Sequence, residues 1–143
     1  VLKASFRLAQ HDIPHSVIYM LEPGRFRAPR SKGEREHAAP ADLRNELYPD
    51  WAAARIFVTH TRPETILGVV HPLTTGSART AALGYSAQGG TLTTSGMLFV
   101  NRCTWAHILD EAARVLGIRR EELLASEEMA ALDGRASPEG VII

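Results

Sequence analysis

The feature of this sequence that most restricts its fold is the stretch of residues 80–117, TAALGYSAQGGTLTTSGMLFVNRCTWAHILDEAARVLG. A short run typical of a β-strand opens it at residues 80–85, and a glycine-containing loop follows. Two helices in tandem are predicted after that loop. A strand, a glycine turn and an apolar-faced helix in this order are typical of the closing edge of a layered α/β domain.

The tandem helices carry their own start and stop signals. The hydroxyls of Thr94 and Ser95 can accept hydrogen bonds from free backbone N–H groups, which predicts a first helix over residues 95–101. Thr104 can cap the second helix, and Gly117 stands where a left-handed stop is expected. The second helix has an apolar face made of Trp105, Ile108, Leu109, Ala112, Val115 and Leu116.

Strands and helices are predicted to alternate in the preceding part of the chain. Residues 16–21, SVIYML, form a nearly continuous apolar run rich in β-formers, which fits a strand covered on both faces. A second strand is predicted at residues 55–60, with helices at residues 41–48 and after Pro63. The expected fold class is therefore α/β, with three layers and a mostly parallel or mixed sheet flanked by helices.

The chain starts within a predicted helix. Leu2, Phe6 and Ala9 recur at helical spacing, and no capping residue precedes them. Because natural domains rarely begin inside a helix, we expect the chain to be a piece of a longer protein whose sheet lacks its first strand.

The C-terminal part is predicted to be helical and then irregular. Residues 119–133 are expected to form one helix, with Glu128 among its exposed acidic residues, and the apolar end of the tail either docks or frays. We expect residues 1–117 to form the α/β domain, and residues 118–143 to pack on the same domain as a helix and tail.

Composition excludes several classes of function. A length of 143 residues favours one domain, and a hydrophobic fraction of 45% is enough for a core. With 16 basic and 16 acidic side chains the net charge is zero, so we expect neither nucleic acid nor a membrane as a partner. The single Cys103 cannot form an internal disulfide, and no apolar run is long enough to span a membrane. These features predict a cytoplasmic protein.

Residues 25–40 form a polar segment rich in basic side chains. Arg25, Arg27 and Arg30 are candidates for binding an anion, because guanidinium groups match phosphate oxygens. The alternative is a solvated loop in which Glu34 and Glu36 cancel part of the positive charge.

A second candidate anion site lies before the first tandem helix. There the glycine pair and Thr91 precede Thr94 and Ser95, and a helix N-terminus presents free N–H groups to an anion. A plain connection between strand and helix is the alternative, since no lysine of the kind found in nucleotide-binding loops accompanies it.

Histidine and cysteine spacing does not predict a catalytic or metal site. His11 and His15 are four residues apart, but Pro14 lies between them and breaks the helix that would align them as metal ligands. The other histidines show no paired metal-ligand spacing; they are His37, His60, His71 and His107. Cys103 and His107 are four residues apart, but no third group that would orient the pair is evident. We therefore expect no catalytic, cofactor-binding or metal-binding residue in this chain.

The order of several motifs resembles a known family. A strand RIFVTH is followed by TRPETILGVVHPL, then by GYSAQGGTLTT and by SGMLFVNRCTWAHILDEAARVLG. Together with SVIYML, this order resembles the C-terminal domain of the thiamine-diphosphate-dependent transketolase superfamily, and in particular that of phosphoketolases. The resemblance covers residues 1–117.

The resemblance implies a non-catalytic assembly or regulatory domain of an enzyme acting on keto-sugar phosphates, an aldehyde-lyase or ketol transferase. In that family thiamine diphosphate and Mg²⁺ lie between the first two domains of paired subunits. The implied partners are therefore upstream domains of the same enzyme and a second subunit of a homodimer, and the isolated chain is expected to be inactive. The alternatives are a regulatory module that binds an anionic effector, such as a nucleotide or phosphate, and the C-terminal domain of a related 2-oxo-acid dehydrogenase.

Overall fold

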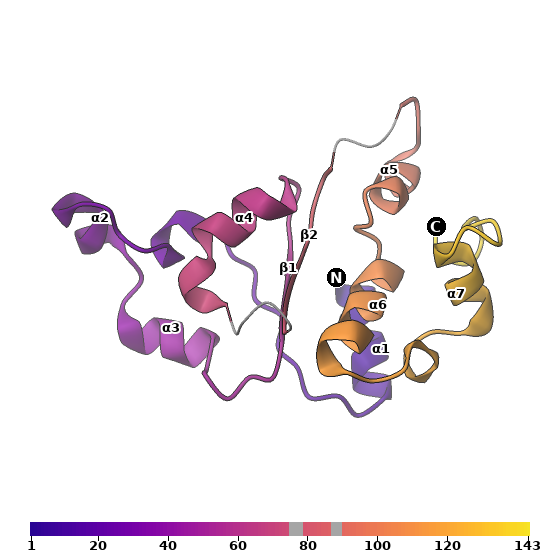
Figure 1. Cartoon of the computed structure of the whole chain (residues 1–143), viewed down its shortest axis with the longest axis horizontal. Helices are drawn as coiled ribbons and strands as arrows, with labels where there is room; N and C mark the ends of the chain where they lie inside the picture. Colours follow the sequence, from indigo (N-terminus) through magenta and orange to yellow (C-terminus); the bar gives the residue numbers. More distant parts are fainter. Residues whose placement is uncertain (75–78, 87–89) are drawn as a thin grey trace.

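The structure is a computed structural model, and it describes residues 1–74, 79–86 and 90–143. The protein has a mixed α/β fold, as predicted (Figure 1). The α-helices are α1 (Leu2–Gln10), α2 (Lys32–His37), α3 (Ala41–Leu47), α4 (Pro63–Val69), α5 (Thr94–Val100), α6 (Trp105–Leu116) and α7 (Ser126–Leu132). Single 3-10 turns occur at η1 (Pro23–Phe26), η2 (His71–Leu73) and η3 (Arg120–Glu122).

A small parallel sheet stands at the centre of the molecule. Its described strands are β1 (Arg55–Val58) and β2 (Thr80–Leu83), which pair in parallel with Arg55 opposite Thr80. The chain passes from β1 to β2 through α4, so these elements form the predicted βαβ unit. The predictions of strands near residues 55–60 and 80–85 are confirmed.

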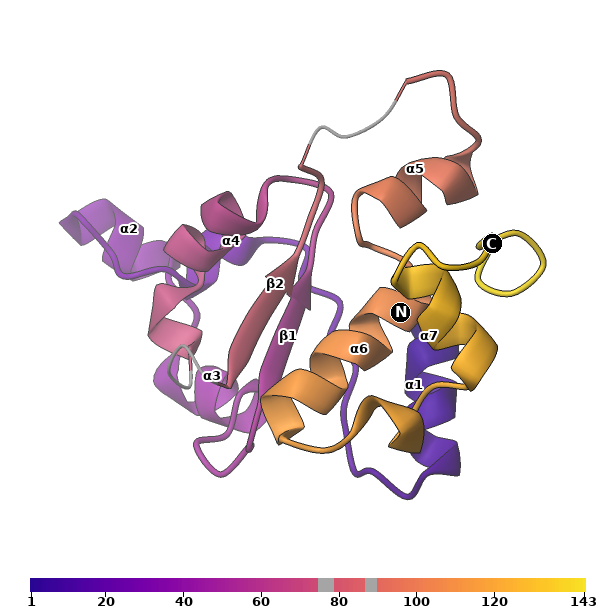
Figure 2. The same cartoon turned by 45° about the vertical axis from the view of Figure 1, so that its right-hand side comes forward.

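Helices cover both faces of this sheet (Figures 1 and 2). On one face the core is built around α6, with Leu83 and Ile56 from the strands packed against it. On the other face Phe57 packs with a second cluster, whose buried members are Phe26, Ala39, Val70 and Leu73. The alternation of Ile56 and Phe57 follows from the two-residue period of a strand.

The predicted boundaries of α6 are confirmed. The Thr104 side chain accepts from the N–H of His107, and Gly117 ends the helix with a φ of 70°. Most residues of α6 are buried, and many of them are alanines or aliphatic residues of the larger core cluster. Helix α6 is therefore the central element of that core.

The predicted strand at residues 16–21 is wrong. This segment lies in an extended path without strand pairing, and its backbone forms no hydrogen bond with a described residue (Figure 1). Val17, Tyr19 and Leu21 are exposed to 48%, 87% and 78%. An apolar run of β-formers becomes a strand only when a ladder partner lies beside it, and no described strand pairs with this one.

The helix predicted at the start of the chain is confirmed as α1, but the apolar residues that indicated it face the solvent. Leu2, Phe6 and Ala9 are exposed, and Ala4 is the buried residue of the helix. The opposite side of α1 packs on α6, where the Lys3 ammonium lies 4.0 Å from the Trp105 ring centroid. Ala4 and Leu8 face the core on this side, and the long stems of Lys3 and Arg7 cover the apolar surface beside them.

Residues 119–133 do not form the single helix that was predicted. The chain makes the turn η3, buries Leu123 and Leu124, and begins α7 only at Ser126. Breaking the helix allows two adjacent leucines to face the same core. Glu128, predicted to be exposed, is buried and bound to Arg7 at 2.9 Å.

Candidate functional site

The candidate anion-binding arginines lie between η1 and α2. Arg27 and Arg30 both bind the carboxylate of Glu34, which also accepts from the backbone N–H of Arg30 at 2.7 Å. The hydrogen bonds from Arg30, together with the nearby charge of Arg27, lower the pKa of Glu34 to about 2. Arg25 donates from Nε to the carbonyl of His37 at 3.2 Å.

These contacts make the arginines part of a local scaffold. Ser31 caps α2 by accepting from the N–H of Glu34, and Glu34 then ties two guanidinium groups to that helix. An incoming phosphate has to compete with a carboxylate that already fills the same fork geometry.

The second candidate anion site lies at the start of α5. Thr93, rather than Thr94 or Ser95, is the capping residue, because its hydroxyl accepts from the N–H of Gly96 at 3.1 Å. Thr91, Thr94 and Ser95 are exposed, and Gly89 lies outside the described residues. The cap prediction is thus displaced by one residue, since the chain turns into the helix at Thr93.

The two candidate sites are not brought together. In Figure 1, α2 lies at one end of the molecule and α5 near the other, with the sheet between them. A single ligand therefore does not contact both sets of residues.

The Cys103 and His107 side chains bond to separate partners. The Cys103 thiol donates to the carbonyl of Asn101 at 3.2 Å, and burial raises its pKa. His107 Nδ1 lies 2.7 Å from the Thr104 hydroxyl, and burial, aided by the charge of Arg102, lowers the pKa of His107 to about 4. A thiol with a raised pKa is a poor nucleophile, so this geometry favours a structural role for both residues.

Sequence reasoning missed a polar junction at the carboxyl ends of the strands. Asn101 is buried, and its Oδ1 accepts from the backbone N–H of Ser86 at 2.9 Å while its Nδ2 donates to the Met97 carbonyl at 2.9 Å. Nearby, the backbone passes so closely that a Cβ at Gly84 would overlap the Thr61 carbonyl. The sequence signal that could have indicated this junction is Asn101, a polar residue at the end of the apolar helix α5.

This junction occupies the edge at which open parallel sheets usually bind ligands. A hydrogen bond from the Ser86 N–H to Asn101 joins the end of β2 to the end of α5, and the Tyr85 N–H donates to the Thr61 carbonyl across the strands at 2.9 Å. The polar groups therefore act first as a brace between the sheet and the tandem helices.

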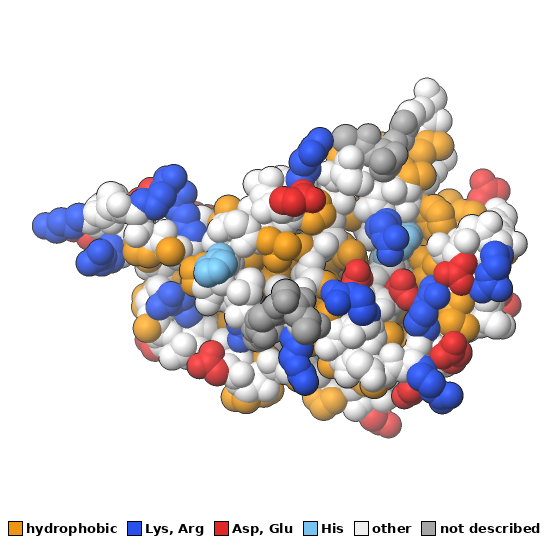
Figure 3. Space-filling view, viewed as in Figure 1, with side chains coloured by type: hydrophobic (Ala, Val, Ile, Leu, Met, Phe, Trp, Pro, Cys, Tyr) orange, Lys and Arg blue, Asp and Glu red, His pale blue; other side chains and the backbone are white. Residues whose placement is uncertain are grey.

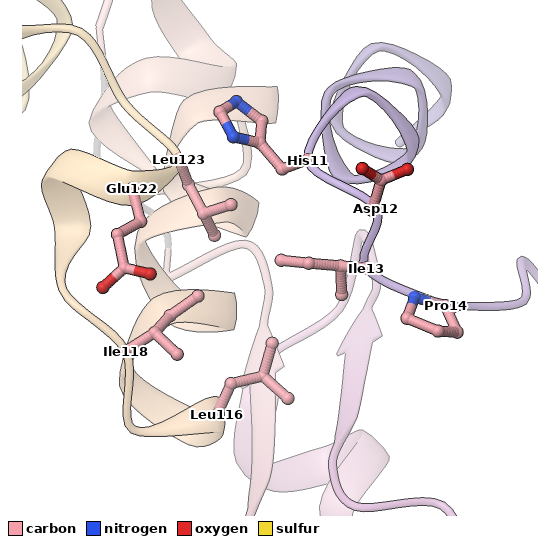
Figure 4. Close-up of a pocket in the computed structure, with 8 residues that line it drawn as sticks. All are labelled: His11, Asp12, Ile13, Pro14, Leu116, Ile118, Glu122 and Leu123. Carbon is pink, nitrogen blue, oxygen red and sulfur yellow. The ribbon is translucent and has the colours of Figure 1, made fainter.

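A cavity of about 570 Å³ lies between the end of α1 and the chain after α6 (Figure 4). Ile13 points into it from the α1 side, toward Leu123 and Ile118 on the opposite wall. His11 and Asp12 stand on one side and Glu122 on the other. A ligand pocket needs polar groups that converge, and this cavity is instead an apolar seam between helices.

Charge is distributed unevenly over the surface. In Figure 3 basic side chains gather at the α2 end, whereas both signs are mixed over the α6 and α7 end. The basic residues at the α2 end are Arg27, Arg30, Lys32 and Arg35. In the part of the chain that the structure describes, no three His, Cys, Asp or Glu side chains form a group able to hold a metal ion. Over the same residues, the helices are too short or too polar to cross a membrane.

Several large apolar side chains are exposed to solvent on the described surface. Leu2 and Phe6 of α1 are exposed to 77% and 65%, and Trp51 to 86%. Leu2 and Phe6 belong with the exposed residues of segment 16–21, because the Ser5 hydroxyl of α1 lies 2.7 Å from Nε2 of His15, and exposed apolar side chains of this kind often mark interaction sites. Trp51 lies in the loop before β1 and is not part of this set.

Comparison of the chain with protein-family models, with curated proteins and with solved structures finds no match in any of the three.

Proposed function

We propose that this chain is the non-catalytic C-terminal domain of a thiamine-diphosphate-dependent, phosphoketolase- or transketolase-like enzyme that acts on keto-sugar phosphates. Its role in that enzyme is assembly, with its partners the upstream domains and a second subunit. We also propose that the domain has three layers and that its sheet contains more strands than the two described.

The order of elements supports this proposal. A parallel β1–α4–β2 unit leads into α5 and α6, which follow each other directly and are capped by Thr93 and Thr104. The resemblance to the family depends on these elements and also on the segment SVIYML, which is extended but pairs with no described strand.

The observation that carries the assembly role is the exposure of large apolar side chains. Leu2, Phe6, Tyr19 and Leu21 each expose more than half of their surface. Burying such side chains stabilises a complex by about 1.5–3 kcal/mol per residue, so an assembly partner is the economical explanation for them.

The residues present do not fit thiamine diphosphate and Mg²⁺. The diphosphate requires free cationic or backbone donors, whereas Arg27 and Arg30 are held by Glu34. The described carboxylates and histidines also include no cluster suited to a divalent ion. The proposal therefore assigns the cofactor to other domains of the enzyme.

Calorimetry and co-purification test the proposal together. We expect the chain alone to bind no thiamine diphosphate in the presence of Mg²⁺ and to leave xylulose 5-phosphate intact, with an intact phosphoketolase as the positive control. We expect it to co-purify with a phosphoketolase from which the C-terminal domain has been deleted. Tight, Mg²⁺-dependent cofactor binding by the chain alone, or substrate cleavage by it, would contradict the proposal.

A further inference from the structure

We propose that segment 16–21 is a dimerisation strand, which pairs antiparallel with the same segment of a second copy of this chain. The inference rests on the exposed side chains that carry the proposed assembly role, and it assigns them to one partner, a second copy of this chain, rather than to the upstream domains. It can therefore fail while the proposed function stands.

The backbone of the segment is available for pairing. Between residues 16 and 21 no N–H or carbonyl group makes a hydrogen bond with a described residue, and the path is extended (Figures 1 and 2). Unpaired extended backbone is a template for another strand, and proteins usually protect such an edge with charge or proline. Segment 16–21 contains neither.

The side chains alternate as they do on a half-buried strand. Val17, Tyr19 and Leu21 are exposed, whereas Ile18 and Met20 are half-buried, and Met20 packs against the second core cluster. An antiparallel pair centred on Tyr19 places each Val17 opposite the partner's Leu21 and Tyr19 opposite Tyr19. Aromatic and branched pairs of this kind stabilise antiparallel strands.

The exposed side chains extend beyond the segment. Residues of α1 extend the surface, because the Ser5 hydroxyl lies 2.7 Å from Nε2 of His15 at the start of the segment. Leu2, Phe6, Val17, Tyr19 and Leu21 expose between 48% and 87% of their surface, and they are the side chains available to an interface that, at standard size, covers about 800 Å² on each partner.

Charge does not oppose the pairing of two copies. The paired strands carry no ionisable side chain except the weakly acidic tyrosine, and the whole chain has a net charge of zero. Two copies of the segment therefore meet without like-charge repulsion. In a two-fold symmetric contact, any charge in the interface is present twice, so such repulsion would otherwise be large.

Sedimentation velocity of the full chain over a wide range of concentrations tests the proposal. We expect a monomer–dimer equilibrium that Tyr19→Lys weakens at least about tenfold, because the two-fold axis places two lysines opposite each other. Trp51→Lys is the matched control: it makes the same kind of change at a side chain that is 86% exposed outside the segment, and we expect it to leave dimerisation unchanged. Circular dichroism verifies that both variants are folded.

Disulfide trapping tests the register. In a Cys103→Ser background, Tyr19→Cys is expected to give a covalent dimer under mild oxidation, since directly opposed strand residues lie within disulfide reach. Trp51→Cys in the same background is expected to cross-link far more slowly. A monomer at every concentration, as intramolecular pairing of the segment with β1 would give, overturns the proposal. A dimer that is indifferent to Tyr19→Lys overturns it as well.

Discussion

His107 couples the stability of this protein to pH. Burial, with a smaller effect of Arg102, lowers its pKa from 6.5 to about 4. The unfolded chain therefore binds a proton near pH 6.5 that the folded chain does not bind until about pH 4. Since the extra proton is on the unfolded side, stability falls as the pH is lowered through this window.

We expect the free energy of unfolding to decrease by about 1–2 kcal/mol between pH 7 and pH 5, as measured by urea denaturation. His107→Gln should remove this part of the pH dependence, whereas His60→Gln, a change at an exposed histidine, should leave it intact. Titration of the His107 ring near pH 6.5 by NMR would contradict the prediction.

Glu128 joins the first helix to the last. Burial alone would raise its pKa, but the hydrogen bonds from Arg7 and from the backbone N–H of Ala125 outweigh burial and hold the pKa below its ordinary value. Removing one member of such a partly buried pair leaves the other charge without its counter-ion.

We expect Glu128→Gln to lower the free energy of unfolding at pH 7 by about 1–3 kcal/mol, and Glu127→Gln, at an exposed neighbour, to change it by less than about 0.5 kcal/mol. Because the folded-state pKa is lowered, the stabilisation is present above the ordinary carboxyl pKa and is lost as the pH falls below it. The gap between wild type and Glu128→Gln should accordingly shrink below about pH 4.5. Equal effects of both substitutions would show that the pair contributes nothing.

At the scale of elements, a glycine inside a helix and a glycine just after one should respond in opposite ways to substitution by alanine. Gly117 ends α6 with a φ of 70°, where a Cβ is strained, whereas Gly68 lies inside α4 with open space around its Cβ position. We expect Gly117→Ala to destabilise by about 1 kcal/mol and Gly68→Ala to stabilise by about 0.5–1 kcal/mol in urea denaturation. A stabilising Gly117→Ala would mean that the left-handed stop is unimportant.

At the scale of the whole molecule, the C-terminal tail closes the larger core. Ile142 is buried, and its carbonyl accepts from the Trp105 indole N–H at 3.0 Å. The prediction that this tail either docks or frays is thus resolved in favour of docking.

Deleting residues 141–143 is expected to lower the free energy of unfolding by about 2 kcal/mol, because it exposes apolar core and removes the indole's acceptor. Trp51→Phe provides the background in which fluorescence reports on Trp105 alone. In that background we expect the emission of the truncated chain to shift to the red. An unchanged emission maximum would show that the tail does not shield Trp105.

The sequence by itself determined where several elements begin and end. Thr104 and Gly117 delimit α6, and the alternation of apolar runs with helical patterns predicted β1, α4 and β2 in the right order. These features depend on residues a few positions apart, so a local pattern is sufficient to predict them.

Only the tertiary structure decided which faces and charges are buried. The Arg7–Glu128 pair joins residues 121 positions apart, on the side of α1 where Ala4 and Leu8 face the core and Phe6 does not. Likewise, segment 16–21 has the composition of a strand but no described strand beside it. The same physical reason applies in each case: burial and pairing require a partner from a distant part of the chain, which local periodicity does not contain.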